Sequence, residues 1–187
     1  MSKHRKLLVL DIDHTLIHTV LFDGVNGDEL VIYQKLLKKE FPNARRFPDE
    51  PKAVIVPRPH LAEFTNFLDR NKSNFGIGIY STGTAKYLSA ALTAVFPWAI
   101  GNARFIWDVS YCKETNGVLL KDLAQITSSL SYPLEHIRIL DDSDVVVQKG
   151  QRIVVEPFLA TELKKARSDD ELLRIMPKIE RWASLEN

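Results

Sequence analysis

The fold predicted for this chain is decided by the stretch Leu7-Leu8-Val9-Leu10-Asp11-Ile12-Asp13-His14-Thr15-Leu16. Four aliphatic residues in a row, at 7–10, are typical of a strand that is buried on both faces, as in a parallel sheet covered by helices. Two carboxylates, Asp11 and Asp13, follow this strand directly. Because ligands bind beyond the carboxyl ends of strands in open α/β sheets, these two acids are the first candidates for a functional site.

A pair of carboxylates one residue apart has two interpretations. Like charges this close repel each other unless a cation or a proton lies between them, so Asp11 and Asp13 would suit a hard divalent metal and a phosphate group. Alternatively, the two side chains only cap a turn or the next helix. The pair alone does not decide between them, and the choice rests on the remainder of the chain.

The composition is that of an ordinary globular protein. The chain has 187 residues, 45% of them hydrophobic and 26% charged, with a formal net charge of +1. This length suits a single domain over residues 1–187 with a sizeable core. A weak net charge argues against nucleic acid or a membrane surface as an obligatory partner. The apolar runs are too short for a transmembrane helix, and the basic start at Lys3, His4, Arg5 and Lys6 lacks the long apolar region of a signal peptide.

The single cysteine, Cys112, bears on both compartment and chemistry. One cysteine cannot form an intramolecular disulfide, which suits a reducing compartment, so we expect an intracellular protein of the cytoplasm or nucleus. A cysteine-based phosphatase loop is excluded, because the position six residues on is Val118 and not an arginine. We expect the thiol of Cys112 to be packed or to have no functional role. Separately, we expect the protein to be a monomer.

Strands and helices are predicted to alternate along the chain. Short apolar runs predict strands at 54–56, 75–80, 104–109, 138–140 and 153–155. Amphipathic stretches predict helices over about 60–70, 85–96 and 121–129, and a further helix that carries Leu172, Leu173 and Ile175. Such alternation indicates an α/β fold whose core is a parallel sheet flanked by helices.

The segment between the first strand and residue 54 is less clear. Turns are predicted at Asp23-Gly24 and Asn26-Gly27. Residues 28–41 then fit either a helical stripe or, at 30–33, a strand. Residues 42–51 are predicted to form a polar loop.

Local signals also predict how two helices begin and how one ends. Thr84 is expected to cap the helix over 85–96. Ser168 and Glu171 have the spacing of a capping box for the last helix. Pro177 is expected to break or kink that helix.

Three of the predicted strands end in polar clusters: Asp11 with Asp13, Ser81 with Thr82, and Asp141 with Asp142. A lysine, Lys121, is predicted to open the helix before the last of these strands. With these residues the chain resembles the haloacid-dehalogenase-like (HAD) phosphatases. Their first motif, DxDx(T/V), matches Asp11-Ile12-Asp13-His14-Thr15, and their other three motifs match Ser81, Lys121 and the pair Asp141-Asp142.

Within that superfamily, the chain resembles the FCP/SCP branch, which dephosphorylates the C-terminal domain of RNA polymerase II. Further matches lie at Leu10 to His18, Arg58-Pro59-His60 with Glu63-Phe64, Ala85-Lys86-Tyr87, Lys121-Asp122-Leu123, Leu140-Asp141-Asp142-Ser143, and Glu171-Leu172-Leu173 to Pro177. The resemblance covers most of the chain except about 21–53. It implies a Rossmann-like HAD fold with a small insert after the first motif, at about 21–56.

The spacing of the motifs limits any lid over the site. Ser81 and Lys121 are 40 residues apart (121 − 81), about what one helix, one strand and their loops need. Thr15 and Ser81 are 66 residues apart (81 − 15), which leaves room only for the small insert. No large cap is therefore expected, and an open site favours a bulky substrate. Five basic side chains of the insert either contact acidic partners or form a solvated face: Lys35, Lys38, Lys39, Arg45 and Arg46.

The resemblance implies a role for each motif residue in phosphoryl transfer. Asp11 is the expected nucleophile, which forms an aspartyl-phosphate. Asp13 is the expected general acid and later base, a role that requires a raised pKa, which neighbouring carboxylates would favour. Ser81, with Thr82, should bind a phosphoryl oxygen, and Lys121 should offset negative charge on the transferring group.

The resemblance also implies Mg²⁺ as the cofactor. Its expected ligands are Asp11, the backbone carbonyl of Asp13 and the side chain of Asp142, because this cation prefers oxygen ligands. Thr15 should tie down the loop after the strand, and Asp141 should position the lysine. The branch usually has asparagine in place of Asp142, and we expect the additional negative charge to hold Mg²⁺ at least as well.

The expected function is the hydrolysis of phosphate monoesters in phosphorylated proteins or peptides, with phosphoserine and phosphothreonine favoured. The alternatives are a protein tyrosine phosphatase, a small-molecule or nucleic-acid-end phosphatase, and a catalytically silent binding module, since the resemblance reaches a mitochondrial import component built on this domain. The silent module is disfavoured because such non-enzymes tend to lose the nucleophile or metal ligands, which are present here. His14 and His18 are expected to have surface or packing roles rather than catalytic ones, and Arg58 is expected to form a structural turn.

Overall fold

A computed structural model describes residues 6–25, 27–47 and 50–185 of the chain. The basic residues Lys3, His4 and Arg5, and Asn26 of a predicted turn, lie outside the described residues, as do residues 48–49 of the predicted polar loop. No described helix is both long and apolar enough to cross a membrane.

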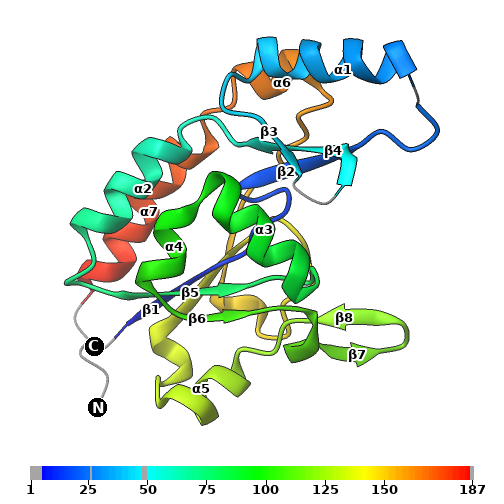
Figure 1. Cartoon of the computed structure of the whole chain (residues 1–187). Helices are drawn as coiled ribbons and strands as arrows, with labels where there is room; N and C mark the ends of the chain where they lie inside the picture. Colours follow the sequence, from blue (N-terminus) through cyan, green and yellow to red (C-terminus); the bar gives the residue numbers. More distant parts are fainter. Residues whose placement is uncertain (1–5, 26, 48–49, 186–187) are drawn as a thin grey trace.

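The core is a five-stranded parallel sheet, which confirms the predicted α/β fold class (Figure 1). Its strand order is β10-β9-β1-β5-β6, and every pairing in it is parallel. The strands are β1 (Leu7–Leu10), β5 (Gly76–Tyr80), β6 (Ala103–Trp107), β9 (Ile137–Asp141) and β10 (Arg152–Val154). The five strands lie within a few residues of the predicted ones.

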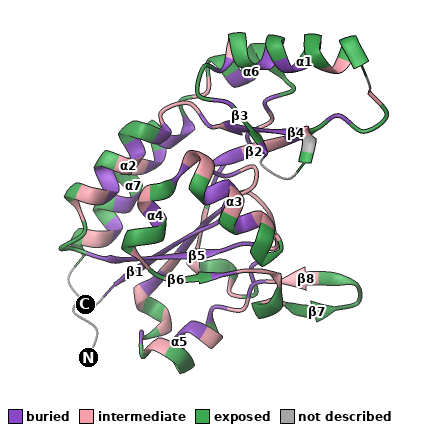
Figure 2. Ribbon diagram, viewed as in Figure 1, coloured by how far each residue is buried: buried purple, intermediate pink, exposed green. Residues whose placement is uncertain are grey.

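Helices cover both faces of the central strand, as its unbroken aliphatic run predicts. Leu8 and Leu10 pack in one cluster with apolar side chains of α2 (Leu61–Arg70), α3 (Ala85–Val95) and α7 (Glu171–Ser184). Leu7 and Val9 face the other way, towards α5 (Ala124–Leu130). All four side chains of β1 are fully buried, and Figure 2 shows β1 and β5 within the buried core. At about 1.5–3 kcal/mol for each buried aliphatic side chain, β1 contributes roughly 6–12 kcal/mol to folding.

The insert after the first motif forms a small antiparallel sheet of its own. β2 (Ile17–Leu21), β4 (Glu50–Pro57) and β3 (Arg45–Phe47) pair in the order β2-β4-β3. The predicted strand at 54–56 belongs to the longer β4, and the predicted polar loop at 42–51 is partly strand, which corrects that prediction. β4 is buried from both sides, because Ala53 and Ile55 face the core while Val54 and Val56 face α1.

Residues 28–41 form a helix, α1 (Gly27–Glu40), rather than a strand. It lies over the small sheet together with α6 (Leu163–Arg167), on the side away from α3 (Figure 1). An ion pair between Glu40 and Arg167 links the two helices. The five basic residues noted in the insert are exposed on α1 and β3: Lys35, Lys38, Lys39, Arg45 and Arg46.

The helix before β9 begins later than predicted. Lys121 does not open it, because its backbone forms a parallel bridge with Val146, donating to Val145 O at 2.8 Å and accepting from the amide of Val147 at 2.9 Å. A hairpin of β7 (Lys113–Thr115) and β8 (Val118–Leu120) precedes it. The remaining elements of the described residues are the 3₁₀ turns η1 (Val109–Tyr111), η2 (Leu134–His136) and η3 (Lys149–Gln151) and the short helix α4 (Pro97–Asn102).

The predicted N-cap of α3 is confirmed, whereas the capping box predicted for α7 and the break predicted at Pro177 are wrong. The hydroxyl of Thr84 accepts from the amide of Tyr87 at 3.3 Å, as expected of an N-cap. Ser168 instead donates back to carbonyls of α6, so no capping box forms, and α7 begins after Asp170. The helix also continues through Pro177 to Ser184, because its later apolar residues are buried against the core.

Candidate active site

The polar ends of three neighbouring strands meet at one edge of the central sheet. Because β1 lies between β5 and β9, the chain leaves the sheet at Asp11, Ser81 and Asp141 side by side. The amide of Asp11 still belongs to the sheet and donates to the carbonyl of Leu140 at 2.9 Å. The structure therefore brings the strand-end residues together in the way that their order in the sequence predicts.

Lys121 is buried between two of these carboxylates. Its ammonium group donates to Oδ1 of Asp11 and, at 2.8 Å, to Oδ2 of Asp141. Only 1% of the lysine is exposed. Burial by itself lowers the pKa of Lys121, but the two carboxylates outweigh burial and raise it, so the side chain stays charged.

Three acids at this edge form a cluster suited to a cation. Carboxylate oxygens of Asp11, Asp141 and Asp142 lie within 4.8 Å of one another. Burial raises the pKa of Asp11 to about 7 against the opposing charge of Lys121, and burial and Asp141 raise the pKa of Asp142. One ammonium group cannot balance these carboxylates, so a bound cation would relieve their repulsion. An all-oxygen ligand set of this kind fits Mg²⁺.

Hydrogen bonds among the described residues divide the three acids into two kinds. Both oxygens of Asp141 are used, since Oδ2 accepts from Lys121 and Oδ1 accepts from the amide and hydroxyl of Ser143 at 2.9 and 2.8 Å. Asp11 and Asp142 each accept side-chain hydrogen bonds through Oδ1 only. Asp11 and Asp142 are therefore the acids best placed to hold a metal, while Asp141 orients the lysine.

Thr15 connects the loop after β1 to the tip of β9. Its hydroxyl donates to Oδ1 of Asp142 and accepts from the amide of Asp142, both at 3.1 Å. The side chain is fully buried. The two contacts fix the position of Asp142 relative to the first motif.

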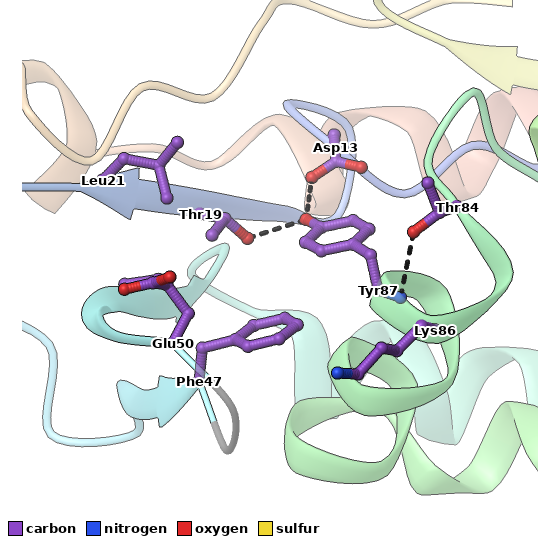
Figure 3. Close-up of a pocket in the computed structure, with 9 residues that line it drawn as sticks. Asp13, Thr19, Leu21, Phe47, Glu50, Thr84, Lys86 and Tyr87 are labelled. Carbon is purple, nitrogen blue, oxygen red and sulfur yellow. Dashed lines mark hydrogen bonds between the residues drawn. The ribbon is translucent and has the colours of Figure 1, made fainter. Parts of the chain in front are cut away.

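Asp13 meets a tyrosine from helix α3 (Figure 3). The Tyr87 hydroxyl donates to Oδ1 of Asp13 and lies 2.7 Å from Oγ1 of Thr19 on β2. Burial raises the pKa of Asp13, and the hydrogen bond from Tyr87 offsets part of this rise. The pKa is thus raised in the direction that the sequence suggests, but burial is the main cause rather than the neighbouring carboxylates.

Sequence reasoning does not single out Tyr87 for this site. A periodic pattern predicts its helix, but it does not show which residue of the first turn faces Asp13. Gly83 gives a partial signal, because a Cβ at this position would lie 2.7 Å from the Tyr87 ring and 3.2 Å from Oγ of Ser81. Only glycine allows the ring to approach the turn this closely.

The turn after β5 presents the remaining predicted residues. Ser81 is buried, and its hydroxyl accepts from the amide of Gly83 at 2.9 Å. Thr82 is half-buried beside it, and within the described chain no side-chain hydrogen bond joins Thr82 to the acids. Cys112 is also half-buried, with Sγ 3.9 Å from the carbonyl oxygen of Ser81, and burial raises the pKa of its thiol.

An open cleft of about 520 Å³ lies beside Asp13, between the insert and α3 (Figure 3). Its walls include the rings of Phe47 and Tyr87, which stack with their centroids 5.6 Å apart. Leu21 and Ala53 add apolar surface, and the remaining lining residues are polar: Thr19, Glu50, Thr84 and Lys86. The cleft can therefore receive an apolar or aromatic group next to the acid.

Three residues close to the first motif have no catalytic role predicted from the sequence, and all three make structural contacts: Arg58, His14 and His18. The guanidinium of Arg58 is buried and donates to both carboxylate oxygens of Asp169 at 2.8 Å and to the carbonyl of Thr15 at 3.0 Å. The Nδ1 atoms of His14 and His18 contact backbone groups of the segment after β10. These contacts fix the loop that carries the first motif.

Comparisons with known proteins agree with this architecture. The family described as NLI interacting factor-like phosphatase matches residues 6–187. Among solved structures, that of Fcp1, described as an essential RNA polymerase II CTD phosphatase, matches 96% of this chain with a TM-score of 0.60 and 17% identity. A fission yeast Fcp1 variant bound to beryllium fluoride matches 99% with the same score and identity. The chain spans 53% and 58% of those two proteins, and such identities show the fold alone. No curated protein matches this chain.

Proposed function

Because the chain belongs to the family of NLI interacting factor-like phosphatases, we propose that it is a Mg²⁺-dependent phosphoprotein phosphatase that acts through an aspartyl-phosphate on Asp11. Phosphoserine and phosphothreonine are the favoured substrates. We further propose that residues 1–187 act as one domain, inside the cell, in the cytoplasm or nucleus.

The observation that carries this proposal is the position of Lys121 between Asp11 and Asp141. An ammonium group has three protons, and two of them are used by these carboxylates. The third can bind a phosphoryl oxygen next to the nucleophile. Ser81, from the neighbouring strand tip, supplies a hydroxyl on the same edge of the sheet.

In the first step, an oxygen of Asp11 attacks phosphorus, and the bond between phosphorus and the leaving oxygen breaks. Asp13 donates its proton to that leaving oxygen. The buried setting that raises the pKa of Asp13 favours the protonated form that this step needs. Tyr87 holds Oδ1 of Asp13, which leaves Oδ2 as the oxygen that carries the proton.

In the second step, Asp13 takes a proton from water, and the water oxygen attacks phosphorus. The acyl-phosphate bond to Asp11 breaks, which releases phosphate and restores the carboxylate. Asp11, the backbone carbonyl of Asp13 and Asp142 would hold Mg²⁺, whose contribution at such a site is to screen the charge between carboxylate and phosphate. Lys121 offsets the remaining negative charge.

The open cleft beside Asp13 supports the proposal that the substrate is a phosphorylated protein or peptide. The small sheet and α1 stand to one side of the site, and the cleft of about 520 Å³ is open to solvent. A phosphorylated side chain on a peptide can therefore reach Asp11 while neighbouring residues of the peptide occupy the cleft. Phe47, Tyr87 and Leu21 would contact those neighbours.

Two measurements test the proposal. The first is hydrolysis of p-nitrophenyl phosphate with and without Mg²⁺, compared with Asp11→Asn. We expect activity that requires Mg²⁺ and is lost in the variant, whereas a chain inactive under all conditions would be the silent binding module. The second is a panel of phosphoserine, phosphothreonine and phosphotyrosine peptides, sugar phosphates and nucleotides. If sugar phosphates, nucleotides or phosphotyrosine peptides are hydrolysed faster than the phosphoserine and phosphothreonine peptides, the proposed substrate class is wrong.

A further inference from the structure

Helix α1 exposes an apolar surface that the site described above does not use. Its inner face carries the buried residues Gln34 and Leu37, and Leu37 packs in one cluster with Val54 and Val56 of β4. Its outer side chains include Ile32, 56% exposed, and Leu36, 47% exposed. An apolar groove of about 490 Å³ runs beside them, between α1 and the end of β2.

Four residues of α1 lie along one seam on this outer side. Glu29, Ile32, Leu36 and Lys39 are spaced by three, four and three residues, the spacing that keeps side chains in line along one face of a helix. All four are exposed. At 100° per residue, the seam points away from Gln34 and Leu37.

The seam is complementary to itself when it is read in the opposite direction. In an antiparallel pair of identical helices, the first position of the seam meets the fourth position of the partner, and the second meets the third. Glu29 then lies opposite Lys39 at both ends, and Ile32 lies opposite Leu36 at both central positions. Opposite charges flank an apolar centre, and no like charges meet along the seam.

We propose that this outer seam of α1 is the contact surface for a second copy of the chain, joined antiparallel about a twofold axis between Ile32 and Leu36. This replaces the monomer expected from the sequence. A contact of three helical turns belongs to the class of small, weak interfaces, so association is expected only at high protein concentration. Tyr33 and Leu163 line the adjacent groove and would extend the apolar contact.

The proposed contact leaves the phosphatase site accessible. Val54 and Val56 of β4 face α1, while Ala53 and Ile55 face the core and α3. The small sheet therefore separates α1 from the helix that carries Tyr87 (Figure 1). Substitutions on the outer seam are expected to leave hydrolysis of p-nitrophenyl phosphate unchanged.

Sedimentation equilibrium up to about 1 mM protein, the range in which weak interfaces associate, tests the proposal. We expect the apparent mass to rise from 21.3 kDa toward twice that value. Glu29→Lys and Lys39→Glu, each alone, place like charges opposite each other at both ends of the seam and should keep the mass at the monomer value. Because each variant then matches the other, a mixture of the two should associate again.

Two substitutions of exposed apolar residues test whether association depends on the seam or on another side of the helix. Leu36→Ser should abolish association, whereas Val31→Ser, on another side of α1 and 40% exposed, should not. Circular dichroism checks that each variant keeps its helix content. A wild-type chain that stays at 21.3 kDa throughout overturns the proposal, as does association that both charge reversals leave intact, or a mixture that fails to associate.

Discussion

The hydroxyl of Tyr87 on α3 donates a hydrogen bond to Oδ1 of Asp13, the acid two residues after the proposed nucleophile. The same hydroxyl lies 2.7 Å from Oγ1 of Thr19 in the insert. One tyrosine therefore connects the core helix, the insert and the first motif, and it occupies one of the two carboxylate oxygens of Asp13.

Tyr87→Phe should lower kcat for p-nitrophenyl phosphate about tenfold, because a hydrogen bond to a charged group is worth about 1.5–3 kcal/mol and a tenfold change in rate is about 1.4 kcal/mol. KM should change less, since the ring still stacks on Phe47. Thr19→Val is the matched control: it removes the other partner of the hydroxyl and should cost much less. Equal losses in the two variants would contradict a direct role for the Asp13 contact.

Lys121→Met should destabilise the fold by about 3–5 kcal/mol, because it leaves the buried carboxylates of Asp11 and Asp141 without their cation. Urea denaturation measures the change in the free energy of unfolding. Adding Asp141→Asn to this variant should restore part of the stability without restoring activity. An unchanged unfolding midpoint in Lys121→Met would show that the lysine does not neutralise these acids in the folded chain.

Asp142→Asn should raise the Mg²⁺ concentration for half-maximal activity about tenfold, since Mg²⁺ affinity depends on the charge of its carboxylate ligands. At saturating Mg²⁺, kcat should stay close to that of the wild type, because asparagine keeps an oxygen ligand. A Mg²⁺ titration of both proteins gives the two values. If the titration curves coincide, the Asp142 carboxylate does not hold the metal.

Acidification should destabilise the chain through His18. Burial and the neighbouring His14 lower the pKa of His18 to about 4 from its ordinary value of 6.5. Between these two values the unfolded chain binds a proton that the folded chain does not, so stability is lost as pH falls from 6.5 to 4. After allowance for partial exposure, the loss is about 1–2 kcal/mol.

The substitution that checks this pH dependence is His18→Asn. An amide oxygen can accept the hydrogen bond that Nδ1 of His18 now accepts from Ala160 at 2.8 Å, but it does not titrate. Urea denaturation at several pH values should show that the variant gains stability relative to the wild type as pH falls from 6.5 to 4, since the opposing contribution of Asp11 is the same in both proteins. A profile with the same slope would place the acid sensitivity elsewhere.

The central sheet and its polar strand tips are predictable from sequence because each depends on a local pattern. The aliphatic run at 7–10 fixes a doubly buried strand, and the acids or hydroxyls that follow β1, β5 and β9 mark one edge of a parallel sheet. The strand order predicts that these strand ends lie side by side, whereas the approach of Lys121 to the acids is implied only by the resemblance to the HAD phosphatases, since its backbone position differs from the predicted helix start.

The insert is not predictable in the same way. β2 and β3 are short edge strands that depend on pairing with β4, which lies between them. β2 pairs with a strand more than 30 residues away (53 − 21 = 32), and β3 has only three residues, so neither shows a periodic pattern of its own. The course of α7 beyond Pro177 likewise depends on burial of Ile179 and Trp182, which offsets the missing backbone hydrogen bond.

The position of β1 between β5 and β9 has a consequence for biosynthesis. Among the strands of the central sheet, β1 is synthesised first, and its two neighbours follow only with residues 76–79 on one side and residues 137–140 on the other. Until both have emerged, the nascent chain carries an apolar strand with open edges, which favours capture by a chaperone and, failing that, aggregation. The edge that carries Asp11, Ser81 and Asp141 can therefore assemble only after β9 has emerged, and a chain that stops before β9 keeps an unpaired edge of β1 exposed.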